Sequence, residues 1–105
     1  MKIIGITSCA NGIAHSYMAA EALEIGFKEY SDGKVKIEIQ GALGIENKLS
    51  NSDIEEADLI VFANDVGVRE KERFEGLENK IFKTNPHEAI KNIDKIVKDA
   101  VSMVK

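Results

Sequence analysis

A strand, a turn of small residues and the start of a helix follow one another in the stretch Lys2-Ile3-Ile4-Gly5-Ile6-Thr7-Ser8-Cys9-Ala10-Asn11-Gly12-Ile13-Ala14-His15-Ser16. Cys9 is the single cysteine of the chain and stands where the apolar run ends. A lone cysteine is often only a small buried hydrophobic residue. A turn after a first strand is not a core position, however, and N–H groups at a helix N-terminus stabilise a thiolate or a nearby phosphate. The position of Cys9 therefore favours a reactive thiol.

The helix predicted after this turn runs from about residue 12 and ends at the turn residues Ser31-Asp32-Gly33. Its apolar residues recur at helical spacing. One stripe consists of Ala14, Met18, Ala22 and Ile25, and Ala19, Leu23, Phe27 and Tyr30 widen it. We expect this broad face to pack against a sheet.

The first strand covers about residues 2–7, and three further stretches have the pattern of strands. Val35, Ile37 and Ile39 alternate with polar residues, which predicts a half-exposed strand at a sheet edge. Residues 40–51 are expected to form a loop. Residues 59–63 are continuously apolar, as in a central strand covered on both faces, and residues 81–84 form a short fourth strand.

Helix signals separate these strands. Ser52 and Glu55 form a capping-box pattern for a short helix that ends near Ala57. A short helix is also expected near residues 69–74. Asn85 and Pro86 supply the cap and first-turn proline of the last helix. Its buried face is expected to consist of Ile90, Ile93, Val97, Ala100, Val101 and Val104.

Alternation of strands and helices predicts an α/β fold, a doubly wound four-stranded parallel sheet of order 2-1-3-4 with helices on both faces. In that order the first strand borders the point where the chain reverses direction across the sheet. Ligands of open α/β sheets bind outside the carboxyl ends of strands at such a point. Cys9 falls there on topology alone.

Composition narrows the class of protein. The 105 residues are expected to form a single domain spanning positions 1–105. A net charge of −4 gives no support to nucleic-acid binding. One cysteine cannot form an internal disulfide, so we expect a protein of the cytoplasm. No apolar segment approaches the roughly 20 residues that span a bilayer, so we expect no membrane insertion. Cys9, His15 and His87 have no zinc-site spacing, and we expect neither metal nor other cofactor.

Several residues beside Cys9 are candidates for its chemistry. Gly12 would allow close approach of a ligand or simply relieve the turn. His15 would contact the bound group, lower the pKa of the thiol if protonated, or only orient the turn. Ser16 would donate its hydroxyl to a phosphate oxygen or the thiolate, or serve as a first-turn helix residue. We expect the thiol pKa to lie below the roughly 8.5 of a free cysteine.

The spacing Cys9-x5-His15-Ser16 invites comparison with cysteine phosphatases, whose phosphate loop is Cys-x5-Arg-Ser/Thr. The arginine is missing here, and no Lys or Arg occurs between Lys2 and Lys28. Phosphatases use that guanidinium for bidentate contact with the phosphoryl oxygens as charge develops. Without it hydrolysis should be slow, so a phosphocysteine would persist long enough to be handed on. This difference favours a carrier over a hydrolase.

The same residues resemble a known family. The run Ile6-Thr7-Ser8-Cys9-Ala10-Asn11-Gly12-Ile13-Ala14-His15-Ser16-Tyr17-Met18-Ala19-Ala20-Glu21-Ala22-Leu23 is similar to the active-site signature of the fructose-type IIB component of the bacterial phosphoenolpyruvate-dependent sugar phosphotransferase system. The similarity continues at Glu38-Ile39-Gln40-Gly41, Gly44-Ile45-Glu46-Asn47, Ala57-Asp58, Asp65 and Glu72-Arg73-Phe74. At positions 10, 11 and 16 the family usually has Pro, Thr and Thr. Ser16 keeps the hydroxyl, whereas Ala10 removes a rigid proline and Asn11 exchanges a hydroxyl for an amide.

The resemblance implies a phosphoryl relay. A phosphohistidine on a IIA partner would phosphorylate Cys9, and the group would pass to a sugar, most commonly fructose in this family, held by the membrane IIC component. Backbone N–H groups would hold the phosphate along the loop of Ala10, Asn11, Gly12, Ile13, Ala14, His15 and Ser16. Arg69 and Arg73 are candidate partner contacts, although a solvated helix face would explain them as well. The alternatives are a cysteine-based phosphatase or reductase and a regulatory module that signals by its phosphorylation state.

Overall fold

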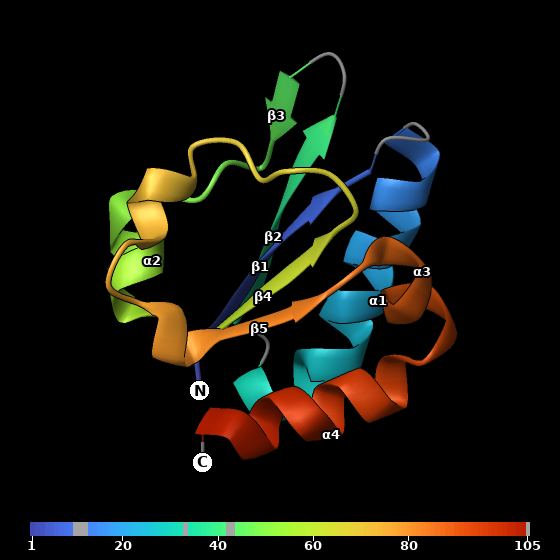
Figure 1. Cartoon of the computed structure of the whole chain (residues 1–105). Coiled ribbons are helices and arrows are strands. Elements are labelled where there is room, and N and C mark those ends of the chain that lie inside the picture. The colour runs from blue at the N-terminus through green and yellow to red at the C-terminus, as the bar shows by residue number, and fades with distance from the viewer. Residues whose placement is uncertain (10–12, 33, 42–43, 105) are drawn as a thin grey trace.

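In the part of the chain that the structure describes, five strands form one mixed sheet in the order β3-β2-β1-β4-β5 (Figure 1). The computed structural model describes residues 1–9, 13–32, 34–41 and 44–104. Strands β1, β2, β4 and β5 run parallel, whereas β3 pairs with β2 in the antiparallel direction. The elements in chain order are β1 (Ile3–Ser8), α1 (Ile13–Ser31), β2 (Val35–Gly41), β3 (Gly44–Glu46), α2 (Asn51–Glu56), β4 (Leu59–Asn64), η1 (Lys71–Phe74), η2 (Glu78–Lys80), β5 (Ile81–Thr84), α3 (Pro86–Lys91) and α4 (Ile93–Val104).

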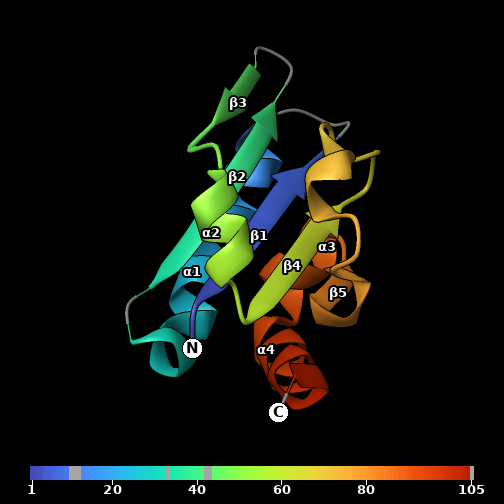
Figure 2. The same ribbon diagram turned by 90° about the vertical axis from the view of Figure 1, so that its left-hand side faces the viewer.

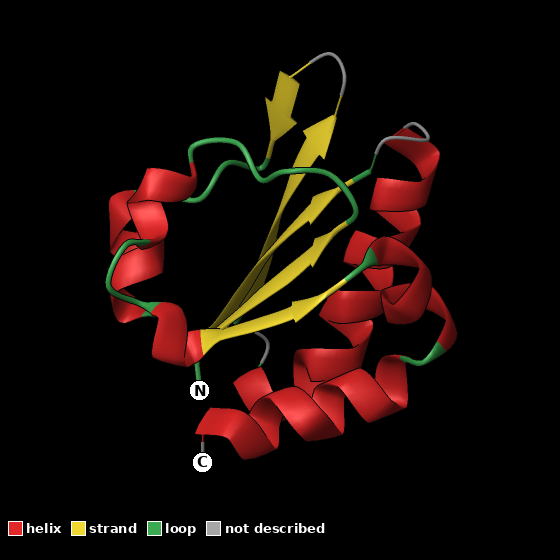
Figure 3. Cartoon of the chain, in the orientation of Figure 1, coloured by secondary structure: helices red, strands yellow, loops and turns green. Residues whose placement is uncertain are grey.

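Helices cover both faces of this sheet (Figure 3). Helices α1, α3 and α4 pack on one face, where their apolar residues join those of β1, β2 and β4 in one core cluster. Helix α2 and the 3-10 helix η1 lie over the other face, as Figure 2 shows for α2. Among the described residues, no helix is long and apolar enough to cross a bilayer.

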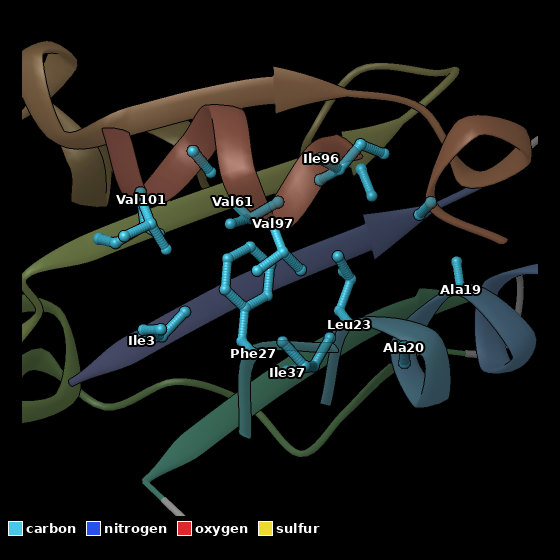
Figure 4. Packing of buried hydrophobic residues seen from close by; sticks show 14 of the residues in the cluster. Ile3, Ala19, Ala20, Leu23, Phe27, Ile37, Val61, Ile96, Val97 and Val101 are labelled. Atoms are coloured by element: carbon cyan, nitrogen blue, oxygen red, sulfur yellow. The ribbon is translucent and has the colours of Figure 1, made fainter. Parts of the chain in front are cut away.

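The larger core lies between the sheet and the three helices α1, α3 and α4 (Figure 4). Leu23 and Phe27 of α1 are fully buried there against strand residues such as Ile3 and Val61. Burying a side chain of this size contributes roughly 1.5–3 kcal/mol. Gly26 lets α4 come close, because a Cβ at that position would lie 2.6 Å from Cγ1 of Ile93.

The register of the parallel strands brings their carboxyl ends to one edge of the sheet. Ser8, the last residue of β1, is paired with Gln40 of β2 and Asn64 of β4. Cys9 and Asp65 follow directly after Ser8 and Asn64. The first and fourth described strands therefore present these two side chains side by side.

The predicted α/β class and the parallel order are confirmed, since the predicted order 2-1-3-4 corresponds to β2-β1-β4-β5. The number of strands is wrong, because Gly44–Glu46 adds a fifth, antiparallel strand within the segment predicted as a loop. This strand covers the edge of β2, so β2 is not the half-exposed edge strand that was predicted. Its polar residues Glu38 and Gln40 are buried.

Helix α1 turns a different face inward from the one predicted. Ala14, Met18 and Ile25 of the predicted stripe are exposed, whereas the flanking residues Leu23 and Phe27 are buried. Apolar residues occupy most of the circumference of this helix, so periodicity alone does not single out the buried side. The side that faces the sheet consists of Ser16, Ala19, Ala20, Leu23, Phe27 and Ser31.

The helix caps partly match the prediction. The capping box of α2 is made by Ser50 and Asp53, rather than by Ser52 and Glu55, because the helix begins two residues earlier than expected. Asn85 and Pro86 do open α3 as predicted. The single last helix that was predicted is divided at Asn92 into α3 and α4, and Ile96 joins the expected Val97, Ala100 and Val101 among the buried residues of α4.

Candidate functional site

The thiol of Cys9 meets side chains from two other segments at the carboxyl edge of the sheet. His15 lies in the first turn of α1, and its Nδ1 is 3.3 Å from Sγ of Cys9. Asp65 follows β4, and the thiol donates to its Oδ2 over 3.3 Å. The N–H of Asp65 also donates to the carbonyl of Ser8 over 3.1 Å, which fixes the start of this loop beside β1. The first turn of α1 and the distant loop after β4 thus converge on one sulfur atom.

The two contacts give the thiol a defined protonation chemistry. A thiol has one proton to donate, and the Asp65 carboxylate accepts it. His15 complements this arrangement in the tautomer that carries its proton on Nδ1, because that N–H then donates to the sulfur. A carboxylate that accepts from the thiol and an imidazole that faces the sulfur are groups that can activate a nucleophilic thiol.

Two buried hydroxyls near this edge lack a hydrogen-bond partner within the described part of the chain, those of Thr7 and Ser16. Ser16 is 1% exposed and lies in the first turn of α1, one residue after His15. Thr7 lies two residues before Cys9 in β1 and is also fully buried. A buried hydroxyl without a partner costs about 1–3 kcal/mol, so such groups call for an explanation. A hydroxyl at a helix start is suited to donate to an anion.

The predicted phosphate loop lies only partly within the described residues. Ala10, Asn11 and Gly12 lie outside them, and Ile13 is placed only as the first residue of α1. Ala14 is exposed, His15 is half-buried beside the thiol, and Ser16 is buried. The phosphate-binding role of this loop stays a prediction.

A buried polar cluster lies on β2, next to the strand that carries Cys9. Arg73 of η1 donates from Nη1 and Nη2 to the two carboxylate oxygens of Glu38, each over 2.9 Å. The amide of Gln40 donates to the same carboxylate over 2.8 Å, and the N–H of Leu49 does so over 2.9 Å. Burial on its own would raise the pKa of Glu38, but these donors, with Arg73 foremost, hold it below its ordinary value. We call Glu38, Gln40 and Arg73 the β2 cluster.

The β2 cluster also fastens the loop that carries Asp65. Gln40 accepts from the N–H of Arg69 over 2.7 Å and donates to its carbonyl over 3.0 Å. Arg69 lies four residues after Asp65. The loop between β4 and η1 is therefore held by Ser8 at its start and by Gln40 near its end.

This arrangement bears on the two predicted partner contacts. The Arg73 side chain is only 11% exposed and its guanidinium is engaged by buried Glu38, which speaks against a contact with a partner protein. The hydrogen bond to Glu38 raises the pKa of Arg73, although burial opposes this shift. Arg69 is exposed, and its guanidinium donates to the carbonyl of Gly41. Partner contact by Arg69 stays a prediction.

Asp65 is the site residue that sequence reasoning did not assign. The signal was present, because an acidic residue directly follows the buried strand 59–63 and its neighbour Asn64. Carboxyl ends of adjacent parallel strands share one edge, so this carboxylate had to lie near Cys9. The sequence analysis did not assign Asp65 because it did not locate the end of β4, which is Asn64.

One cavity lined by described residues lies away from Cys9. It encloses about 460 Å³ beside η1 and β5, with Phe62, Phe74 and Ile81 among its apolar residues and Lys71 and Glu75 among its charged ones. It does not include Cys9, His15 or Asp65. No cluster of three or more His, Cys, Asp or Glu residues able to hold a metal ion occurs in the described ranges.

Comparison with known proteins assigns this chain to a family. The family model for "PTS system, Lactose/Cellobiose specific IIB subunit", where PTS stands for phosphotransferase system, matches residues 4–99. The "PTS system fructose-like EIIB component 2" of Escherichia coli strain K12 is 43% identical over 96 residues, covering 91% of this chain and 88% of that protein. The chain belongs to the IIB family of the sugar phosphotransferase system. The similarity to fructose-like components confirms the resemblance of this IIB chain to the fructose type that its sequence indicated.

Other relatives of this IIB chain agree. The solution structure of an Enzyme IIB subunit of the PTS from Escherichia coli K12 is 40% identical, with a TM-score of 0.87 over 98% of this chain and 93% of that one. The "Fructose-like PTS system EIIBC component" of Escherichia coli K12 is 38% identical over 91% of this chain, which corresponds to 20% of that longer protein. IIB components are phosphotransferase components, so the thiol at the sheet edge belongs to a phosphoryl-transfer protein.

Proposed function

We propose that this chain is the phosphoryl carrier of a fructose-type uptake system, in which Cys9 receives a phosphoryl group from a IIA phosphohistidine and passes it to a sugar held by a membrane IIC component. The observation that carries the proposal is the Cys9 thiol at the carboxyl edge of β1, with Asp65 and His15 each 3.3 Å away, in a IIB chain. Fructose is supported by the names of the relatives. IIC as acceptor is supported by the longer relative named EIIBC.

In the first step, the N–P bond of the donor phosphohistidine breaks and an S–P bond forms at Sγ of Cys9. The Asp65 carboxylate takes the thiol proton as the sulfur attacks. The departing imidazole nitrogen keeps the N–P electron pair and, in net balance, receives that proton. The Ser16 hydroxyl and the N–H groups of positions 10–16 donate to the phosphoryl oxygens.

In the second step, the S–P bond breaks and an O–P bond forms with a hydroxyl of the sugar. The sulfur keeps the S–P electron pair, and the proton lost by the sugar hydroxyl restores the thiol in net balance. Phosphoryl transfer asks mainly for positioning and charge stabilisation, and the loop supplies both. Both partners would dock in turn at the same edge, so each complex should be weak and transient. A carrier of this kind would work in the cytoplasm.

The experiment is to incubate the chain with a phosphorylated IIA protein and to locate the phosphoryl group by peptide mass. We expect one phosphoryl group on Cys9 and none on Cys9→Ser. The proposal fails if Cys9 stays unmodified, if Cys9→Ser accepts a comparable amount, or if the group sits on His15 or His87. Multiple turnovers with release of inorganic phosphate would instead support a phosphatase. A stable phosphocysteine that no IIC membrane and sugar discharge would support a regulatory module.

A further inference from the structure

The loop that carries Asp65 passes across the carboxyl end of β1. It leaves β4 after Asn64 and crosses to the side of the sheet covered by α2 (Figure 1). Asn64 of β4, Ser8 of β1 and Gln40 of β2 form one row across the three strands. The loop starts from this row at Asn64 and is bound again at the same row by Gln40, two strands away. It therefore spans the end of the strand that Cys9 follows.

The first part of this loop has little packing of its own. Asp65, Val66 and Gly67 are exposed, and a Cβ at Gly67 would meet no other atom within 4 Å. Hydrogen bonds at the two ends must therefore fix the position of Asp65. At the near end, the N–H of Asp65 donates to the carbonyl of Ser8 over 3.1 Å. The side-chain amide of Asn64 donates to the carbonyl of Val66 over 2.7 Å.

The far end of the loop is held by a buried side chain. Gln40 is 1% exposed, and its amide oxygen accepts from the N–H of Arg69 over 2.7 Å. Its amide nitrogen donates to the carbonyl of Arg69 over 3.0 Å and to the Glu38 carboxylate over 2.8 Å. One side chain thus binds both backbone groups of a loop residue. Glu38 is fixed in turn by Arg73, so the anchor for this exposed loop is part of the folded core.

We propose that Gln40 is a positioning residue for the chemistry at Cys9, because it fixes the loop after β4 so that the Asp65 carboxylate stays against Sγ. Gln40 acts through Asp65 rather than on the phosphoryl group itself. The inference rests on the proposed function for one point, the use of Asp65 as the acceptor of the thiol proton. A carboxylate that has moved away with its loop cannot take that proton as the sulfur attacks.

The test follows the pH midpoint of Cys9 alkylation, which needs no donor protein. Asp65→Asn should lower this midpoint by about one unit, since the carboxylate disfavours a thiolate. Gln40→Met removes the amide at similar side-chain length and should lower it by about half a unit, because the freed loop carries Asp65 away. The double variant should match Asp65→Asn within about 0.2 unit, since both changes act through one carboxylate. Ser50→Ala, which removes a helix cap of α2, should leave the midpoint unchanged.

A second pair of variants breaks the same contact from the loop. Arg69→Pro and Arg69→Ala both remove an exposed side chain, but only proline also removes the N–H that donates to Gln40. Arg69→Pro should lower the midpoint as Gln40→Met does, and Arg69→Ala should stay within about 0.2 unit of the unsubstituted chain. Because the substituted position is exposed, this pair decides the question even if Gln40→Met does not fold.

Amide hydrogen exchange tests the contact without any substitution. The N–H of Arg69 should exchange at least about tenfold more slowly than in an unstructured peptide. Exchange at the peptide rate would overturn the inference. It is also overturned if Arg69→Pro and a folded Gln40→Met keep the original midpoint, if Arg69→Ala lowers it as much as Arg69→Pro, or if the shifts of Gln40→Met and Asp65→Asn add.

Phosphorylation of Cys9 by phosphorylated IIA is the remaining readout. At saturating donor, Gln40→Met and Asp65→Asn should both slow the transfer, and the double variant should be no slower than Asp65→Asn. A Gln40→Met variant that lowers the alkylation midpoint yet transfers at the original rate would overturn a role in transfer. If the midpoints shift as expected but the unsubstituted chain is never phosphorylated, the proposed function fails while the positioning of Asp65 by Gln40 stands.

Discussion

Two groups of polar side chains are buried near the carboxyl end of the sheet, and they differ in their hydrogen bonds. In the β2 cluster, both oxygens of the Glu38 carboxylate accept from Arg73, and Gln40 and Leu49 supply further donors. Beside Cys9, the hydroxyls of Thr7 and Ser16 are equally buried but have no partner in the described ranges. The two groups are one strand apart, since Gln40 is paired with Ser8.

We interpret the difference as one between residues that hold the fold and residues whose hydroxyls are available to a ligand. A buried charge is tolerable only when it is paired and fully hydrogen-bonded, and Glu38 meets this condition. An unpartnered buried hydroxyl lowers stability, so stability does not explain its presence. The ion pair of the β2 cluster should therefore govern stability, and the residues around Cys9 should govern transfer.

The largest expected effect is the loss of stability when the ion pair of the β2 cluster is broken. Arg73→Met leaves the Glu38 carboxylate buried without its ion pair, and breaking such a pair costs about 3–5 kcal/mol. Urea unfolding measures this loss. Lys95→Met, which breaks the exposed pair with Asp99, should cost less than about 0.5 kcal/mol. A loss below about 1 kcal/mol in Arg73→Met would show that the β2 cluster does not hold the fold.

Stability should also fall in acid. Arg73 and the other donors lower the pKa of Glu38 against the effect of burial, and the N–H of Ser50 with the ammonium of Lys36 lowers that of Asp53. A lowered folded-state pKa gives stability that is complete above the unfolded value, near 4, and is lost as pH falls through the folded value. The urea midpoint should be level above about pH 5 and decline below it. Asp53→Asn should make that decline shallower, and an unchanged decline would contradict the assignment.

Alanine substitutions of Ser16 and Ser50 distinguish a residue that acts in phosphoryl transfer from one that stabilises the fold. Ser16→Ala removes an unpartnered hydroxyl, so the free energy of unfolding should change by less than about 1 kcal/mol while phosphorylation of Cys9 by IIA slows about tenfold. Ser50→Ala removes the cap that accepts from the N–H of Asp53 over 3.1 Å. It should cost about 1 kcal/mol and leave phosphorylation unchanged. The reverse pattern would mean that Ser16 is a structural residue.

The smallest expected effect concerns the thiol itself. The Asp65 carboxylate beside Sγ disfavours a second negative charge, so Asp65→Asn should lower the pH midpoint of Cys9 alkylation by about one unit. Asp58→Asn is the control, because Asp58 accepts from the N–H of Lys2 at the other end of the sheet. A raised midpoint in Asp65→Asn would contradict the contact as described.

The sequence predicted those parts of the fold in which local pattern and burial agree. The run 59–63 can only be a covered strand, and the turn after residues 3–8 placed Cys9 at the sheet edge. The polar face of β2 was predicted to be exposed because the guanidinium that pairs with Glu38 and the backbone that holds Gln40 belong to Arg73 and Arg69, which lie more than 28 residues later in the chain. The prediction of which face of α1 is buried was wrong for a similar reason. Several faces of this helix are apolar, and only contact with the sheet and α4 selects the buried one.

The carrier role proposed for Cys9 is tested most directly by the fate of its phosphoryl group once the donor has been removed. Intact-protein mass spectrometry follows the isolated phosphorylated chain over time, with and without membranes that contain the IIC component and fructose. We predict that the group stays on Cys9 in the absence of the acceptor and leaves it when membranes and sugar are added, with sugar phosphate formed in equal amount. Release as inorganic phosphate at the same rate in both conditions would contradict a carrier.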